Sequence, residues 1–327
     1  MGEPAGVGGE IAAKAWSALR ESSTVFAFVG DATFLPGVPV VRIEEVEDAA
    51  SAFAEALPVL HRPLPAPAIP GKPDARNAPA VIAAIEEAVS LVLAGRAGGV
   101  VTNPIQKATL TAAGFRHPGH TEFLAELCGG MMPVMMLAAP GVDPPLRTVP
   151  VTIHEAVRAA VARLDSPMIV RTGRVAAEGL RRDFGIARPR LVLSGVNPHA
   201  GEDGTMGTED RDVVAPAVAA LRAEGFDVRG PLPADTLFTP AARSGYDVAV
   251  CMFHDQALIP VKTLDMAGGV NVTLGLPIVR TSPDHGTALD IAGRGIADPG
   301  SLVAAIRMAG EMAGVRRAAA ALTEAGA

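Results

Sequence analysis

Residues 250–301 read VCMFHDQALIPVKTLDMAGGVNVTLGLPIVRTSPDHGTALDIAGRGIADPGS. Between short apolar runs and glycines, this stretch carries many titratable and amide side chains, among them His254, Asp255, Lys262, Asn271, Arg280, Asp284, His285 and Asp290. Each ends a predicted strand or begins a predicted loop, where a rigid scaffold presents binding and catalytic groups. A hydrophobic core would not use these side chains. The stretch therefore predicts a small-molecule site.

Strands and helices alternate over most of the chain around this stretch. The pattern predicts strands at Thr24–Gly30, Val38–Ile43, Gly98–Thr102, Met132–Ala139, Arg147–Thr152, Arg190–Gly195 and Val248–Met252. It predicts helices at Gly9–Arg20, Asn77–Arg96, Glu155–Leu164, Met168–Asp183, Glu209–Glu224 and, as one or two helices, Val303–Ala325. Such alternation is typical of an α/β fold with a mainly parallel sheet.

The composition excludes several classes of partner. The 327 residues allow two domains, or one large α/β unit with an insertion. A net charge of −7 with scattered Lys and Arg argues against nucleic acid or an anionic membrane surface. No apolar run approaches the ~20 residues of a spanning helix, and no signal region opens the sequence. Cys128 and Cys251 lack CxxC spacing, so we expect two reduced thiols in a cytoplasmic protein.

The chain begins with a glycine-rich segment, MGEPAGVGGEI. It predicts a tight turn leading into a helix, and its glycine spacing differs from the GxGxxG dinucleotide fingerprint. Two roles remain open for it, a purely structural turn or a direct role at a ligand. Such turns normally follow a strand, and the sequence leaves open whether residues are missing before Met1.

Three of the seven histidines follow predicted strands: His154, His199 and His254. Because the carboxyl ends of parallel strands meet at one edge of a sheet, these side chains can converge there. Three neutral imidazoles with an open coordination position form a catalytic site for a divalent ion, commonly zinc. Taken singly, each histidine would more often be an isolated polar residue at a loop start. We expect His61 and His117 to be solvated surface residues.

The segment Asp284–Pro299 (DHGTALDIAGRGIADP) is similar to the nucleotide-binding loop of the isocitrate and isopropylmalate dehydrogenases. The whole of residues 250–301 resembles the 4-hydroxythreonine-4-phosphate dehydrogenase (PdxA) family of vitamin B6 biosynthesis, and the resemblance extends from GEPAG to the closing helix. It implies an isocitrate/isopropylmalate dehydrogenase-like fold of two α/β/α lobes with a cleft between them. A discontinuous nucleotide-binding lobe would comprise residues 1–115 and 275–327, and a metal- and substrate-binding, dimerisation lobe residues 116–274.

The resemblance also implies roles for particular residues. The family binds a divalent ion (zinc, magnesium or cobalt) through histidines that match His154, His199 and His254, although Glu155 stands where an apolar residue is expected. NAD or NADP would be bound by Asp284, His285, Gly286, Thr287 and Asp290. Substrate-binding positions match His120, Thr121, Lys262, Asn271 and Arg280. For a phosphorylated amino acid this is chemically reasonable, because Arg supplies a bidentate fork and Lys a point charge.

The segment PGHTEFLAEL around His120 also has a local reading. Thr121 is expected to cap a helix, with Glu122 favouring the positive helix end. A helix start can also hold an anion, so capping and substrate binding are compatible.

The resemblance implies NAD(P)-dependent oxidation of 4-phosphohydroxy-L-threonine to 2-amino-3-oxo-4-phosphooxybutanoate, which decarboxylates to 3-amino-2-oxopropyl phosphate. Lys262 or a metal-held water is expected to accept the proton, with Asp255 the weaker candidate. A sibling activity on threonate or erythronate 4-phosphate, or on a cyclic dihydrodiol carboxylate, would use the same side chains. A metal-dependent hydrolase is more remote, because it would not need the loop at 284–299, and a non-enzymatic binding module would not concentrate so many titratable groups.

The family also implies a homodimer whose site lies at the interface. In this chain, Cys128–Leu137 (CGGMMPVMML) is more apolar than an ordinary surface segment. It is compatible with a subunit interface or with one buried strand.

Overall fold

The computed structural model describes residues 1–117 and 119–325. The chain divides into two compact units, one of residues 1–133 and 276–314, the other of residues 134–275 and 315–327. Relative to the lobes expected from the sequence, residues 116–133 fall in the first unit and residues 315–327 in the second. Both units combine sheets with helices, so the α/β class is confirmed.

The first unit contains a parallel sheet in the order β1-β3-β2, formed by Phe28–Gly30, Leu57–His61 and Val40–Ile43. A second parallel pair joins β4 (Val100–Val101) to β11 (Arg280–Pro283). The helices of this unit are α1 (Gly8–Leu19), α2 (Ala49–Ala52), α3 (Ala78–Leu93), α4 (Lys107–Ala112), α5 (His120–Leu127) and the first part of α11 (Gly300–Ala325). Short 3₁₀ turns η1 (Ala32–Phe34), η2 (Val46–Asp48) and η3 (Ala75–Asn77) connect them.

Helix α1 is fixed by its apolar face. Ile11, Trp16 and Leu19 are fully or almost fully buried, and they pack with Phe53 and Leu57 in one hydrophobic cluster. The Trp16 indole N–H donates to the Phe53 carbonyl at 2.8 Å, so the buried ring has apolar packing and its one polar group has a hydrogen-bond partner. These contacts hold α1 against the core of the first unit.

The sheet of the second unit runs β10-β5-β6-β9-β7-β8. These strands are Val270–Leu274, Val134–Ala139, Leu146–Pro150, Val248–Cys251, Arg190–Ser194 and Asp227–Leu232. The pairs β10–β5 and β5–β6 are antiparallel, whereas β6, β9, β7 and β8 are mutually parallel. The expected mainly parallel sheet is therefore confirmed, with an antiparallel part at β10 and β5.

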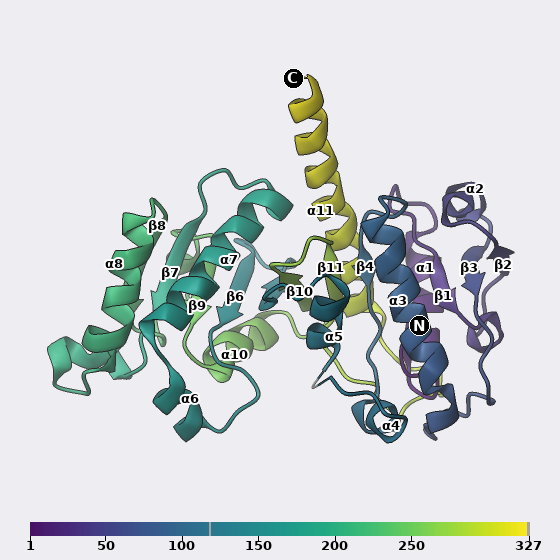
Figure 1. Cartoon of the computed structure of the whole chain (residues 1–327), viewed down its shortest axis with the longest axis horizontal. Coiled ribbons are helices and arrows are strands. Elements are labelled where there is room, and N and C mark those ends of the chain that lie inside the picture. Colours follow the sequence, from purple (N-terminus) through teal and green to yellow (C-terminus); the bar gives the residue numbers. More distant parts are fainter. Residues whose placement is uncertain (118, 326–327) are drawn as a thin grey trace. The chain divides into compact units, whose positions relative to one another are not determined.

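Helices of the second unit are α6 (Val157–Arg163), α7 (Ser166–Phe184), α8 (Ala215–Ala223), α9 (Pro240–Arg243) and α10 (His254–Leu264). Helix α8 packs against β8 and α7 (Figure 1). The predicted helix Glu209–Glu224 is divided into a π-helical turn, η5 (Asp210–Val214), and α8. Pro216 lies in the first turn of α8, and since proline has no N–H it cannot continue a regular α-helix from the preceding turn.

The apolar segment Cys128–Leu137 resolves into two parts. From Val134 onward it is strand β5, with Met136 and Leu137 completely buried, so the reading as a buried strand is confirmed there. Met131 and Met132 precede the strand and are about half exposed, at 49% and 44%. None of the helices in the described part of the chain is both long and apolar enough to cross a membrane.

Candidate active site

The three candidate metal histidines lie beyond the carboxyl ends of adjacent parallel strands in the second unit. His154 follows β6, His254 is the first residue of α10 after β9, and His199 lies in η4 (Pro198–Gly204) after β7. Strand β9 pairs in parallel with both β6 and β7. The expected placement of all three at one sheet edge is therefore confirmed.

The side chains at this edge are only partly assembled for a metal ion. The rings of His154 and His254 lie 5.8 Å apart between centroids. The Nδ1 of His254 lies 2.8 Å from Asp255 Oδ1, a contact that orients the ring and leaves Nε2 for a ligand. Across residues 1–117 and 119–325, no three His, Cys, Asp or Glu side chains are arranged to hold an ion. The donor chemistry suits a divalent ion, and the metal site itself stays a prediction.

The loop that carries His199 has an unusual backbone. Five consecutive residues, 199–203, have positive φ angles between 41° and 80°, although Gly201 is the single glycine among them. Left-handed backbone costs a non-glycine residue about 1–2 kcal/mol. Such a run persists where the surroundings impose it, and strain of this kind concentrates at functional sites.

Asp210 anchors the backbone just before this run. Its side chain is 2% exposed, and its carboxylate accepts hydrogen bonds from the backbone N–H of Val196 at 2.7 Å and of Asn197 at 3.0 Å. The Asn197 side-chain amide donates to Asp210 at 3.1 Å and to Glu209 at 2.8 Å. Sequence reasoning did not identify Asp210 as a site residue, because its partners are backbone groups 13 and 14 residues away.

Gln256 joins the ends of two strands at the same edge. Its amide donates to the Gly195 carbonyl at 2.9 Å, and its carbonyl oxygen accepts from the Ser194 hydroxyl at 3.0 Å. The same oxygen accepts from the Phe253 N–H at 3.2 Å. Gln256 therefore fixes the start of α10, and with it His254, against the end of β7. Gln256 follows His254 by two residues, but its partners Ser194 and Gly195 are 62 and 61 residues away, so the sequence does not indicate this contact.

Lys262 and Asn271 belong to the same unit as the three histidines. Lys262 lies in the last turn of α10 and Asn271 on β10, and both are half-buried. Helix α10 packs against β5, β6 and β9. Their predicted substrate contacts stay predictions.

A buried polar cluster lies in the first unit. Arg280, the first residue of β11, is 4% exposed, and its guanidinium donates to the Thr102 hydroxyl at 2.7 Å. Burial lowers the pKa of Arg280 to about 10. His120 is half-buried, with its Nε2 atom fully buried; desolvation, reinforced by the positive charge of Arg280, holds its pKa well below 6.5. A neutral imidazole beside a buried guanidinium is suited to binding an anionic ligand.

Two atoms of this region lack partners. His120 Nε2 and Asn103 Oδ1 are buried and find no hydrogen-bond partner among the described residues. A buried polar atom without a partner costs about 1–3 kcal/mol, so a ligand or water is expected to satisfy it. Helix α5 begins at His120 after Gly119, which forms no side-chain cap, so the expectation that Thr121 caps the helix was wrong. Thr121 lies in the first turn instead.

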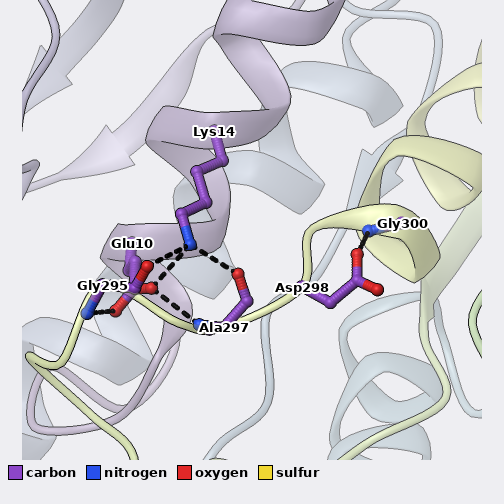
Figure 2. Close-up of polar contacts among 6 residues, drawn as sticks. All are labelled: Glu10, Lys14, Gly295, Ala297, Asp298 and Gly300. Carbon is purple, nitrogen blue, oxygen red and sulfur yellow. Dashed lines mark hydrogen bonds and ion pairs between the residues drawn. The ribbon is translucent and has the colours of Figure 1, made fainter.

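The five candidate cofactor residues, Asp284, His285, Gly286, Thr287 and Asp290, lie on one loop between β11 and α11. A Cβ added at Gly286 would meet no atom within 4 Å, so the backbone is open to a ligand there. Glu10 and Lys14 of α1 bind the later part of this loop (Figure 2). An open glycine and exposed polar groups on an ordered loop suit a nucleotide.

The glycine-rich start of the chain packs against the same loop. The Val7 N–H donates to the Thr287 carbonyl at 3.0 Å. A Cβ added at Gly6 would lie 2.7 Å from that carbonyl oxygen, so no other residue fits there without displacement. GEPAG therefore has a structural role as a tight turn, because it packs against the backbone of the loop at Thr287.

The two histidines expected to be solvated are both largely covered. His117 is 20% exposed; it packs edge-on against Phe115 and tilted against Phe123, with ring centroids 4.9 and 5.0 Å away. His61 is 21% exposed, and its Nδ1 accepts a hydrogen bond from the Ala32 N–H at 3.2 Å. That expectation was wrong, because neighbouring aromatic and backbone groups cover both rings.

The depressed pKa of His120 predicts a pH-dependent stability. Below about pH 6.5 this histidine is protonated in the unfolded chain but not in the folded chain. The free energy of unfolding therefore decreases as the pH is lowered, by at most about 1.4 kcal/mol per pH unit. Between pH 7 and pH 5, wild type should therefore lose more stability than His120→Gln in urea unfolding. His285→Gln, at an exposed position, is the control. Equal losses for wild type and His120→Gln would contradict the prediction.

Comparisons with known proteins cover nearly the whole chain. Residues 21–309 match the family model described as pyridoxal phosphate biosynthetic protein PdxA. A 4-hydroxythreonine-4-phosphate dehydrogenase from Caulobacter vibrioides is 54% identical over 325 residues, covering 96% of each chain. The crystal structure of a 4-hydroxythreonine-4-phosphate dehydrogenase from Klebsiella pneumoniae has a TM-score of 0.86 and 39% identity, covering 96% of this chain and 98% of that one. A terephthalate 1,2-cis-dihydrodiol dehydrogenase from Burkholderia xenovorans has a TM-score of 0.63 and 32% identity, covering 94% and 95%.

Proposed function

The chain belongs to the PdxA family, and we propose that it oxidises 4-phosphohydroxy-L-threonine in pyridoxal 5'-phosphate biosynthesis. NAD or NADP accepts the hydride, and the product is 2-amino-3-oxo-4-phosphooxybutanoate, a β-keto acid that loses CO₂ to give 3-amino-2-oxopropyl phosphate. The observation that carries this proposal is the 54% identity over 96% of the chain to a relative with this name. The buried guanidinium of Arg280 and the neutral imidazole of His120 can donate hydrogen bonds to an anionic substrate.

We assign roles to the chain's own residues accordingly. Arg280, with His120 and Thr121, binds the anionic groups of the substrate, and Asn271 orients its polar groups. Lys262 accepts the proton of the reacting hydroxyl, and Asp255 orients His254 through the 2.8 Å contact. The loop of residues 284–290 binds the nicotinamide cofactor, which carries the hydride.

We further propose that His154, His199 and His254 hold a divalent ion, either zinc, magnesium or cobalt. When bound, such an ion lowers the pKa of the substrate hydroxyl. The placement of the three histidines beyond adjacent strands supports this assignment, as does the carboxylate on His254. Asp210 and Gln256 would hold the loop that carries His199 and the start of α10 in place for the ion.

A sibling activity is the second candidate. The similarity to a terephthalate dihydrodiol dehydrogenase, at 32% identity, makes a cyclic dihydrodiol carboxylate a substrate worth testing. An arginine fork binds carboxylate and phosphate alike, so Arg280 does not discriminate between them. The higher identity to 4-hydroxythreonine-4-phosphate dehydrogenases favours the phosphorylated amino acid.

A substrate panel tests these assignments. Purified protein would be assayed by NADH and NADPH absorbance with 4-phosphohydroxy-L-threonine, threonate and erythronate 4-phosphates, and a cis-dihydrodiol carboxylate, each with and without a chelator. The proposal expects the highest kcat/KM for 4-phosphohydroxy-L-threonine and loss of rate with chelator. Preference for any other substrate would reject the assignment.

We also propose a cytoplasmic homodimer whose site is completed by the second subunit. Exposed apolar side chains support an interface, since Ile259 of α10 is 60% exposed and Met266 just beyond it 71%. The two unpaired cysteines suit a reducing compartment.

Light scattering should give twice the mass of one chain. Hybrids of inactive His154→Ala and Lys262→Ala chains should regain up to about half the activity if these residues reach one site from different chains; no recovery despite subunit exchange would place both in one chain.

A further inference from the structure

Two side chains of α1, Glu10 and Lys14, bind both the N–H groups and the carbonyl groups of the cofactor-loop backbone (Figure 2). The Glu10 carboxylate accepts from the N–H of Ala297 at 2.8 Å and of Gly295 at 3.3 Å. The Lys14 ammonium donates to the carbonyls of Ala297 at 2.6 Å and Gly295 at 2.9 Å, and to Glu10 at 2.8 Å. Residues 293–297 form neither helix nor strand, so these contacts replace the backbone partners that regular structure would provide.

The pair has the properties of a fixed clamp. Glu10 is 8% exposed; burial alone would raise its pKa, but the hydrogen bonds from Lys14 and the Ala297 N–H outweigh burial and lower it. The carboxylate is therefore charged at neutral pH, and Lys14 neutralises it. Both residues project from α1, whose apolar face is anchored by Trp16 in the core. Through these two side chains, a helix packed in the core holds a loop that has no backbone hydrogen-bond ladder of its own.

The clamped segment contains two left-handed glycines, Gly293 with φ 75° and Gly295 with φ 72°. It continues directly from the predicted cofactor residues at 284–290. Without the clamp this segment would gain conformational freedom, and a ligand would have to order it on binding. The Glu10 and Lys14 side chains themselves point at the backbone of the loop (Figure 2).

We propose that Lys14 and Glu10 are positioning residues that preorganise the loop at 284–297 for the dinucleotide. The proposal rests on the function proposed above, since it requires the loop to bind a nicotinamide cofactor. It distinguishes the clamp from ordinary structural ion pairs, because only cofactor binding should respond to its removal.

Direct binding measurements test the proposal. NADH fluorescence titration of Lys14→Met and of Glu10→Gln should show a Kd raised by about tenfold, the equivalent of losing one hydrogen bond to a charged group. The KM for the phosphorylated substrate should stay within about twofold. The double variant should be no weaker than the worse single variant, because the two residues act as one unit.

Arg96→Met is the matched control, since it removes an exposed ion pair with Glu45 and Glu47 in the same unit. It should leave the NADH Kd unchanged. An unchanged Kd in Lys14→Met, beside a wild type that binds NADH, would overturn the clamp alone. Equal rises in both Michaelis constants with a lower melting temperature would mean a merely structural role. A wild type that binds no dinucleotide would overturn the proposed function as well.

Discussion

The Arg280→Met protein should need about a hundredfold more phosphorylated substrate to reach half-maximal rate, because truncating one side of a buried charge pair costs about 2–5 kcal/mol. Arg280 is 4% exposed, and its guanidinium donates to the Thr102 hydroxyl at 2.7 Å. A guanidinium held so far from water gains most from an anionic ligand. Steady-state kinetics with varied substrate at saturating cofactor would measure the change, while the KM for cofactor should stay within about twofold.

Two further variants make the Arg280 test specific. Arg280→Lys keeps the charge but loses the planar fork, so its KM should rise by less than that of Arg280→Met yet clearly above wild type. Thr102→Val removes the hydroxyl partner without touching the charge, and should show a normal KM. If phosphorylated and dephosphorylated substrates are affected equally, Arg280 binds the carboxylate rather than the phosphate. A wild-type KM in folded Arg280→Met would exclude Arg280 from the substrate site.

The parts of the fold that follow from local rules were predictable. Helix α1 extends from Gly8 to Leu19 where Gly9–Arg20 was expected, and α7 from Ser166 to Phe184 where Met168–Asp183 was expected. The placement of three histidines beyond β6, β7 and β9 followed from strand alternation alone. Apolar periodicity and turn residues carry such information within a short window.

Other elements depend on long-range contacts and were missed. Strand β3 is central in its sheet yet contains Pro58, which lacks the N–H of a ladder and argues against a strand from sequence. Its neighbours on both sides, and its burial at Leu57 and Val59, override that local signal. The loop supports Asp210 and Glu10 were missed for a related reason: their partners are backbone groups, which leave no mark in the sequence.

Replacing His254 with Ala should reduce turnover by more than the ~10- to 100-fold typical of an outer-sphere partner, because it removes a proposed metal ligand outright. The Asp255→Asn protein removes the charge that faces His254 Nδ1 at 2.8 Å and should lose activity only within that 10- to 100-fold range. Turnover and bound metal after dialysis would be measured on the same samples. Both variants are expected to fold, since His254 and Asp255 are 37% and 77% exposed.

The matched control for the metal test is His117→Ala, because His117 packs against Phe115 and Phe123 in the other unit. It should lose packing energy but keep both its metal and its turnover at wild-type levels once folded. Added zinc or cobalt should restore Asp255→Asn more than His254→Ala, since the former keeps all three imidazoles. If His254→Ala retains stoichiometric metal and full rate, the three-histidine assignment is wrong, and the hydroxyl proton must be removed without an ion at this sheet edge.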